Sequence, residues 1–147
     1  MTVLPATDIE RLELRTQASP AAVPGVRRAV VDFAQLHGVG HAPDVALAVS
    51  EAVTNAVIHG YRDGNQGDMR IVACAEPDRL VVVVRDYGCG MCPHPDSPGL
   101  GLGLSVIGRL TTEMNIERPD EGGGTRLRMH FSNNRRAVRR RRRGGGR

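Results

Sequence analysis

The feature that most constrains this chain is a small, apolar stretch that carries polar side chains at four-residue intervals. Within residues 50–60, Glu51, Asn55 and His59 recur at this spacing among alanines and valines. Because an α-helix turns about 100° per residue, the three side chains lie within an arc of roughly 80° on one face. A helix that only packs into a core rarely places three polar residues in one stripe. The pattern therefore predicts a helix over residues 43–60 that faces a binding site.

The length and composition predict one globular domain. A chain of 147 residues can bury a core without disulfides or metal, and with no Trp, two Phe and two Tyr this core must be aliphatic. No apolar run approaches the ~18 residues of a membrane span, and the first residues lack the pattern of a secretory signal. We therefore expect a cytoplasmic protein that does not enter a membrane.

The positive charge is concentrated at the C-terminus. Residues 135–147 hold eight arginines and no acid, and removing these eight charges from the net charge of +4 leaves −4 for the rest. A like-charge block with glycine cannot offset its ordering entropy, so residues 133–147 are predicted to form a disordered tail. The tail either contacts nucleic acid or an acidic partner, or is only solvated. The chain has no lysine, which excludes P-loop and Schiff-base lysine chemistry.

Cysteine and histidine residues raise one alternative site. Cys89, Cys92 and His94 lie close enough in sequence to suggest zinc or redox chemistry. They supply only three ligands, and no second CxxC pair completes a tetrahedral zinc site. Because the pair sits inside a glycine-rich loop, we favour a role in that loop over a metal or redox site.

The hydrophobic pattern predicts an α+β two-layer sandwich. Alternation favours a strand over residues 9–16 at an edge of the sheet, and a helix follows to residue 36, beginning near residue 20 or, because of Pro24, near residue 23. Strands 68–75 and 79–86 form an antiparallel hairpin, and the run 80–84 suits a central strand. A helix over 102–111 and strands over 112–117 and 124–131 complete a mainly antiparallel mixed sheet with helices on one face. Residues 1–8 are expected to be flexible, and the domain to span residues 9–132.

Two glycine-rich loops follow the polar helix. Asp86 ends the central strand and precedes Gly88 and Gly90, so a carboxylate that can accept from an exocyclic amine adjoins backbone that a ligand can approach closely. Gly101 and Gly103 lead into a helix whose free N-terminal amides attract anions. Each loop alone is weak evidence, but the two in this order behind the polar helix indicate a nucleotide site.

These motifs resemble those of the GHKL or Bergerat-type ATPases. Residues 51–60 are similar to the N box of that family, residues 86–90 to its first glycine box, and residues 101–104 to its second. Gly124 and Thr125 are similar to its last conserved box. The resemblance extends over residues 12–131 and is strongest to the bacterial anti-sigma factor serine kinases, whose short chain and brief lid (here residues 91–98) it shares.

The resemblance also implies roles for individual residues. Glu51 would be the general base, and Asn55 would bind the Mg²⁺ that bridges the phosphates. Asp86 would bind the adenine amino group with support from Thr125. His59, one turn beyond Asn55, is by its position expected to be a helix-end hydrogen-bonding residue rather than a catalyst. The remaining nucleotide-binding residues would place their backbone against the ligand, namely Gly88, Gly90, Gly101, Leu102, Gly103 and Leu104.

The function that this resemblance implies is an anti-sigma factor with ATP- and Mg²⁺-dependent serine/threonine kinase activity. Its substrate would be an anti-anti-sigma protein, it would sequester a sigma factor, and it would form a homodimer through the strand at residues 10–16. One alternative is a non-catalytic, nucleotide-dependent switch that binds a protein partner. The other is a nucleic-acid-binding protein that acts through its arginine tail.

Overall fold

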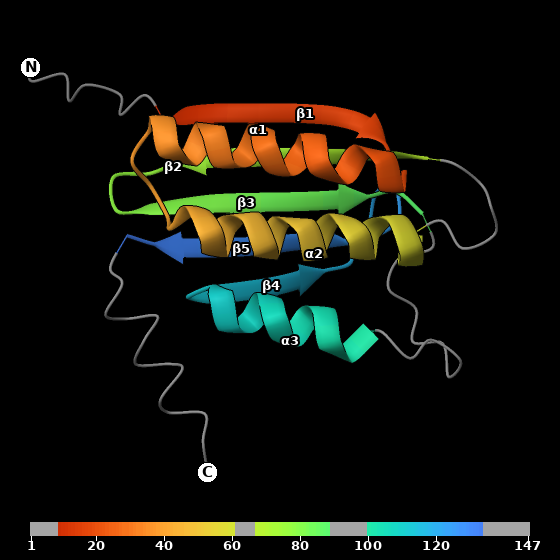
Figure 1. The fold of residues 1–147 in the computed structure, drawn as a ribbon. Coiled ribbons are helices and arrows are strands. Elements are labelled where there is room, and N and C mark those ends of the chain that lie inside the picture. The colour runs from red at the N-terminus through yellow and green to blue at the C-terminus, as the bar shows by residue number, and fades with distance from the viewer. Residues whose placement is uncertain (1–8, 61–66, 89–99, 134–147) are drawn as a thin grey trace, which may run out of the picture.

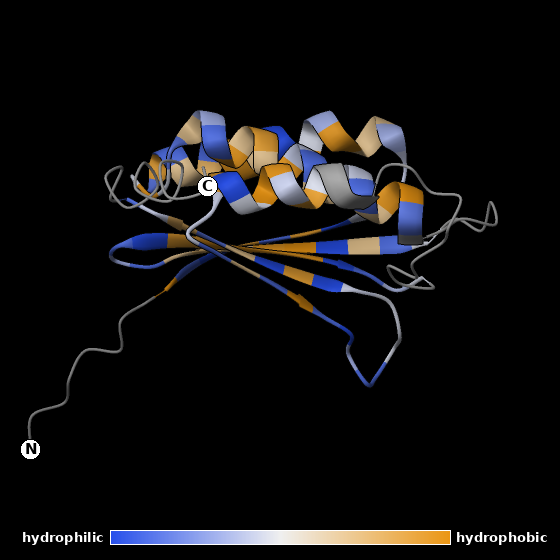
Figure 2. Cartoon of the chain, turned by 90° about the horizontal axis from the view of Figure 1, so that it is seen from below, coloured by the Kyte–Doolittle hydropathy of each residue, from blue (hydrophilic) through white to orange (hydrophobic). Residues whose placement is uncertain are grey.

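The computed structural model describes residues 9–60, 67–88 and 100–133, in which five strands form one sheet and the helices lie on one of its faces (Figures 1 and 2). In chain order the elements are β1 (Glu10–Gln17), the 3-10 helix η1 (Pro20–Ala22), α1 (Val23–Leu36), α2 (Ala42–Gly60), β2 (Asp68–Ala75), β3 (Arg79–Asp86), α3 (Leu100–Leu110), β4 (Glu113–Glu117) and β5 (Arg126–Ser132). The predictions for the N-terminal residues, the lid at 91–98, the cysteine pair and the arginine tail fall outside the described residues.

The sheet has the strand order β1-β2-β3-β5-β4, and each neighbouring pair is antiparallel. The predicted hairpin is confirmed, because β2 and β3 pair directly and the Glu76 N–H donates to the Arg79 carbonyl at 2.9 Å. The valine-rich strand β3 is central and β1 lies at an edge, as the sequence predicts. The α+β prediction is therefore confirmed, and the described sheet is wholly antiparallel where a mainly antiparallel mixed sheet was expected.

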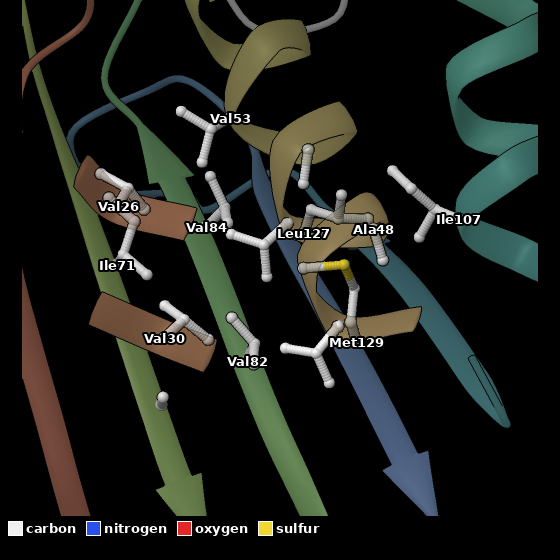
Figure 3. Close-up of a cluster of buried hydrophobic side chains, with 14 of the residues drawn as sticks. Val26, Val30, Ala48, Val53, Ile71, Val82, Val84, Ile107, Leu127 and Met129 are labelled. Carbon is white, nitrogen blue, oxygen red and sulfur yellow. The ribbon is translucent and has the colours of Figure 1, made fainter. Parts of the chain in front are cut away.

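The core lies between the sheet and the helices. Alternate residues of β3, among them Leu80, Val82 and Val84, are buried toward the helices, whereas Val81 and Val83 are half-buried on the opposite face. Figure 3 shows this layer, in which valines of α1 and α2 meet aliphatic side chains of β2, β3 and β5. Burying each such side chain stabilises the fold by about 1.5–3 kcal/mol relative to exposing it. The core is aliphatic, as the composition predicts.

Proline and glycine set the ends of α1. The α-helix begins at Val23, the later of the two predicted starts, and Pro24 lies in its first turn. Proline is tolerated there because the first N–H groups of a helix have no intrahelical acceptor. Gly38 has a φ of 63°, and the Val39 N–H returns to the Ala34 carbonyl at 3.0 Å, which ends the helix.

Two element boundaries differ from the sequence prediction. The helix α3 begins at Leu100 rather than near residue 102, so Gly101 and Gly103 lie in its first turn and do not precede it. The last strand begins at Arg126 rather than at residue 124, because Gly124 has a φ of 76°, which lies outside the β region. At both boundaries, glycines of the family motifs have conformations or packing that favour glycine.

Candidate nucleotide-binding site

The candidate site lies at one end of the two-layer sandwich. Figure 1 shows that β3 and α2 end on the same side of the molecule on which α3 and β5 begin. The four sequence motifs belong to these ends, because Asp86 closes β3, the stripe runs along α2, the second glycine box opens α3, and Thr125 directly precedes β5. Motifs far apart in the sequence therefore lie at one end of the fold.

The polar stripe of α2 lies at the edge of the apolar core. The core-facing side of the helix is formed by valines and alanines, which include Val49, Val53 and Ala56. Asn55 is 6% exposed and His59 is 4% exposed, whereas Glu51 is half-buried. The stripe is thus graded, with a carboxylate that solvent can reach and an amide and an imidazole that it barely reaches.

Gly103 joins the second glycine box to this stripe. A Cβ atom added at Gly103 would lie 3.0 Å from the Asn55 amide nitrogen, 3.1 Å from its oxygen and 3.3 Å from a Glu51 carboxylate oxygen. A side chain at this position would force the neighbouring groups of α2 to move by a few tenths of an ångström, so glycine lets α3 approach α2 this closely. The first turn of α3 and the two polar groups of α2 therefore form one surface.

We predict that Gly103→Ala weakens ATP binding by about fivefold, or roughly 1 kcal/mol, because the new methyl group displaces the Asn55 amide. Gly108→Ala is the matched control, since a Cβ at Gly108 in the same helix meets no atom within 4 Å. Replacing glycine with alanine inside a helix stabilises it by about 1 kcal/mol, so the control should raise the melting temperature and leave ATP binding unchanged. Calorimetric titration of both variants tests this, and equal ATP affinities would contradict the assigned contact.

The Asn55 side chain has an unsatisfied group. Its amide nitrogen is buried and has no hydrogen-bond partner in the described part of the chain. Buried polar groups in proteins are nearly always paired, so an unpaired amide at the edge of a core is a group that a ligand can satisfy. The described residues contain no cluster of three or more His, Cys, Asp or Glu side chains that could hold a metal ion. The unpaired nitrogen is a donor that a phosphate oxygen could satisfy, whereas a divalent cation would bind the Asn55 side-chain oxygen. Such a cation would need its other oxygen ligands from the nucleotide, which suits Mg²⁺.

Asp86 is a buried carboxyl group at the end of β3. It is 4% exposed, and its Oδ1 accepts from the Gly88 N–H at 3.1 Å. Burial raises the pKa of the Asp86 carboxyl above its ordinary value, and hydrogen bonds from the Gly88 and Thr125 backbones, with the charge of Arg85, oppose part of that rise. A buried carboxylate whose charge is only partly stabilised by its neighbours is suited to accept a further hydrogen bond from a ligand amine.

Gly124 and Thr125 hold the backbone of Asp86. A Cβ atom at Gly124 would lie 2.1 Å from the Asp86 carbonyl oxygen, so any other residue would collide with backbone. The Asp86 N–H donates to the Thr125 carbonyl at 3.0 Å, and Thr125 is only 3% exposed. The last conserved box therefore lies against the first glycine box.

The structure brings most of the predicted residues to this end of the fold, with some gaps. Gly88 is described at the end of β3, and Leu104 is half-buried in α3 and packs on the core. Gly101 and Leu102 lie in the first turn of α3, and Gly90 lies outside the described residues. Sequence reasoning missed Arg85, which contacts the turn before Thr125 from the opposite face of the sheet. The only signal was its position, out of phase with the buried residues of β3.

Comparison with known proteins identifies a domain and several relatives. Residues 16–131 match the histidine kinase-like ATPase domain. The serine-protein kinase RsbW of Bacillus velezensis is 32% identical over 120 residues, which cover 80% of this chain and 71% of that protein. The anti-sigma F factor of Clostridium beijerinckii is 32% identical over 95 residues, covering 57% of this chain and 66% of that protein. The anti-sigma F factor of Clostridium novyi is 35% identical over 97 residues, covering 58% and 67%.

The chain thus spans between 66% and 71% of the length of these three relatives. No helix in the described residues is long and apolar enough to cross a membrane. The domain match covers most of the chain and includes all four motif regions described above. This chain belongs to the family of histidine kinase-like ATPase domains.

Proposed function

We propose that this protein is an anti-sigma factor with ATP- and Mg²⁺-dependent serine/threonine kinase activity, which phosphorylates an anti-anti-sigma protein and sequesters a sigma factor in the cytoplasm. The family and the names of the relatives support the use of ATP by a serine kinase and a role as an anti-sigma factor. The observation that carries the proposal is the contact of Gly103 with both Asn55 and Glu51. It joins a candidate metal ligand and a candidate base to the turn that would bind phosphates.

The proposed roles follow from the chemistry of each group. The buried carboxyl of Asp86 would accept a hydrogen bond from the adenine amine, and Thr125 would support it. The amide of Asn55 would orient a Mg²⁺ ion whose other ligands come from the phosphates and water, and this ion would neutralise developing charge. The first turn of α3, from Leu100 to Leu104, would direct backbone N–H groups at the phosphates.

Glu51 would act on the substrate hydroxyl. Its carboxylate is half-buried beside Gly103, so a protein substrate can reach it from solvent. As general base it would take the proton of a serine or threonine hydroxyl while the oxygen attacks the terminal phosphorus. Positioning and electrostatics supply most of the rate in phosphoryl transfer, so the base contributes a part of it.

The direct test is transfer of label from [γ-³²P]ATP to a purified anti-anti-sigma protein of the same source, with and without Mg²⁺. We expect labelled serine or threonine on that protein only when Mg²⁺ is present. ATP binding without transfer to the antagonist would instead support a non-catalytic nucleotide switch. Failure to bind ATP would overturn the proposal as a whole.

We further propose that the protein forms a homodimer through β1. This strand is at the edge of the sheet, so its outer backbone groups have no partner strand among the described residues. Edge strands present N–H and C=O groups on which a second chain can pair. Light scattering is expected to give twice the chain mass of 15.8 kDa, and a mass of one chain at micromolar concentration would contradict the proposal.

A further inference from the structure

Arg85 is a buried arginine that the proposed nucleotide chemistry does not use. It directly precedes Asp86 in β3, and successive side chains of a strand point to opposite faces of the sheet. Asp86, in phase with the buried residues that face the helices, therefore faces the helix layer, and Arg85 faces the other side. Figure 2 shows that the helices lie on one face of the sheet only. Arg85 is nevertheless only 8% exposed, so something other than a helix covers it.

The turn between β4 and β5 covers this side chain. The Arg85 Nη2 donates to the Glu121 carbonyl at 2.9 Å and to the Gly123 carbonyl at 3.3 Å. The guanidinium carbon lies 4.8 Å from the centre of the Tyr87 ring, and a Cβ at Gly122 would lie 3.3 Å from Nη2. One arginine thus connects two backbone carbonyls of this turn to the end of β3.

The glycine-rich sequence of this turn makes it costly to order. Gly122, Gly123 and Gly124 have φ values of 80°, 65° and 76°, a conformation that side chains disfavour. Three consecutive glycines lose more backbone entropy on ordering than any other residues would. Hydrogen bonds from a charged donor are stronger than those between neutral groups, so the two bonds from Arg85 offset part of that loss.

The position of this turn determines the position of Asp86 in the candidate adenine site. Directly after the carbonyls that Arg85 holds, Gly124 packs on the Asp86 carbonyl and Thr125 accepts from the Asp86 N–H. The Thr125 backbone also donates toward the Asp86 carboxyl, which opposes the effect of burial on its pKa. A displaced turn would therefore change both the position and the hydrogen-bond partners of Asp86.

We propose that Arg85 is a positioning residue for nucleotide recognition. From the open face of the sheet its guanidinium fixes the glycine turn, and the turn in turn fixes Thr125 and the Asp86 carboxyl. The inference rests on the proposed function, because it concerns the residue that would read adenine. It adds a determinant of adenine selectivity that lies on the face of the sheet opposite the proposed adenine site.

The test compares Arg85→Met, which keeps the aliphatic stem and removes the donors, with Arg85→Lys, which keeps one charged donor. Arg15→Met is the control, since Arg15 is exposed on the same face of the sheet and loses the same charge. ATP and GTP affinities are measured by calorimetry, unfolding by urea, and exchange of the Asp86 amide by hydrogen–deuterium NMR.

We expect Arg85→Met to weaken ATP binding about tenfold, which corresponds to about 1.4 kcal/mol, and GTP binding by less than twofold. The preference for ATP over GTP should fall, Arg85→Lys should restore part of it, and Arg15→Met should match the wild type. The Asp86 amide should exchange faster in Arg85→Met, while amides in the middle of β3 keep their protection.

Two results would overturn the inference. One is unchanged ATP affinity and unchanged Asp86 exchange in Arg85→Met. The other is an equal loss of ATP and GTP binding that follows the unfolded fraction, since a merely structural arginine would behave in this way. If the wild type bound no ATP, the proposed function would fail, and the exchange of the Asp86 amide would still decide whether Arg85 holds the turn.

Discussion

Glu51→Gln is expected to lower the rate of phosphotransfer by about 10²–10⁴-fold and to change the affinity for Mg²⁺·ATP by less than twofold. Glutamine has the size and hydrogen-bonding shape of glutamate but cannot take a proton at neutral pH. Because the carboxylate lies beside Gly103 at the solvent-facing end of the stripe, this change leaves the packing of α2 against α3 intact. Single-turnover transfer of labelled phosphate, with ATP affinity measured separately by calorimetry, gives the two quantities.

The control for this variant is Glu76→Gln. Glu76 lies in the turn between β2 and β3, at the end of β3 opposite Asp86, and pairs there with Arg79. It undergoes the same chemical change without contact with the proposed site, so its transfer rate should equal that of the wild type. Full transfer by Glu51→Gln would remove the base assignment. Equal losses of transfer and of ATP affinity would instead assign Glu51 to ligand binding.

The layer architecture was predictable because each element carries its own periodic signal. The valine run of β3 indicated a central strand, and the alternation in β1 indicated an edge, and both are confirmed by the strand order. What periodicity cannot state is which faces of two helices approach most closely. The contact of Gly103 with Asn55 depends on a missing side chain, and a glycine near a helix start is equally typical of a loop.

The glycine-rich turn between β4 and β5 illustrates the same limit. The stretch before β5 was predicted as a turn, and its glycines are a sufficient signal for that. Its attachment to Arg85 was not predictable, because the bonds run from a side chain to two backbone carbonyls and leave no trace in residue type. Sequence patterns record what each residue prefers, whereas these contacts depend on the arrangement of strands that are distant in the chain.

Asp86→Asn is expected to weaken ATP binding about 10- to 100-fold, because a ligand amine loses a charged acceptor and such bonds contribute about 1.5–3 kcal/mol. The same variant is expected to raise the free energy of unfolding of the nucleotide-free protein at pH 7. Burial disfavours the charged form of this carboxyl, and an amide of the same shape carries no charge to bury. Asp78→Asn, in the exposed turn between β2 and β3, is the control and should change neither quantity.

The pH dependence separates this explanation from a general effect on packing. The pKa of Asp86 is higher in the folded state than in the unfolded state. Between pH 3.8 and the raised pKa, the folded state therefore binds more protons than the unfolded state. Wild-type stability therefore falls as the pH rises across that window, and the whole cost of the buried charge is present above the raised pKa. Below the unfolded pKa the carboxyl is mostly neutral in both states, and most of the advantage of Asp86→Asn should disappear. Urea unfolding at pH 7 and at pH 3.5 measures this difference. If the greater stability of Asp86→Asn persisted unchanged at pH 3.5, better packing would explain it. If it were lost, Asp86 would be a residue kept at a cost in stability because the ligand needs its charge.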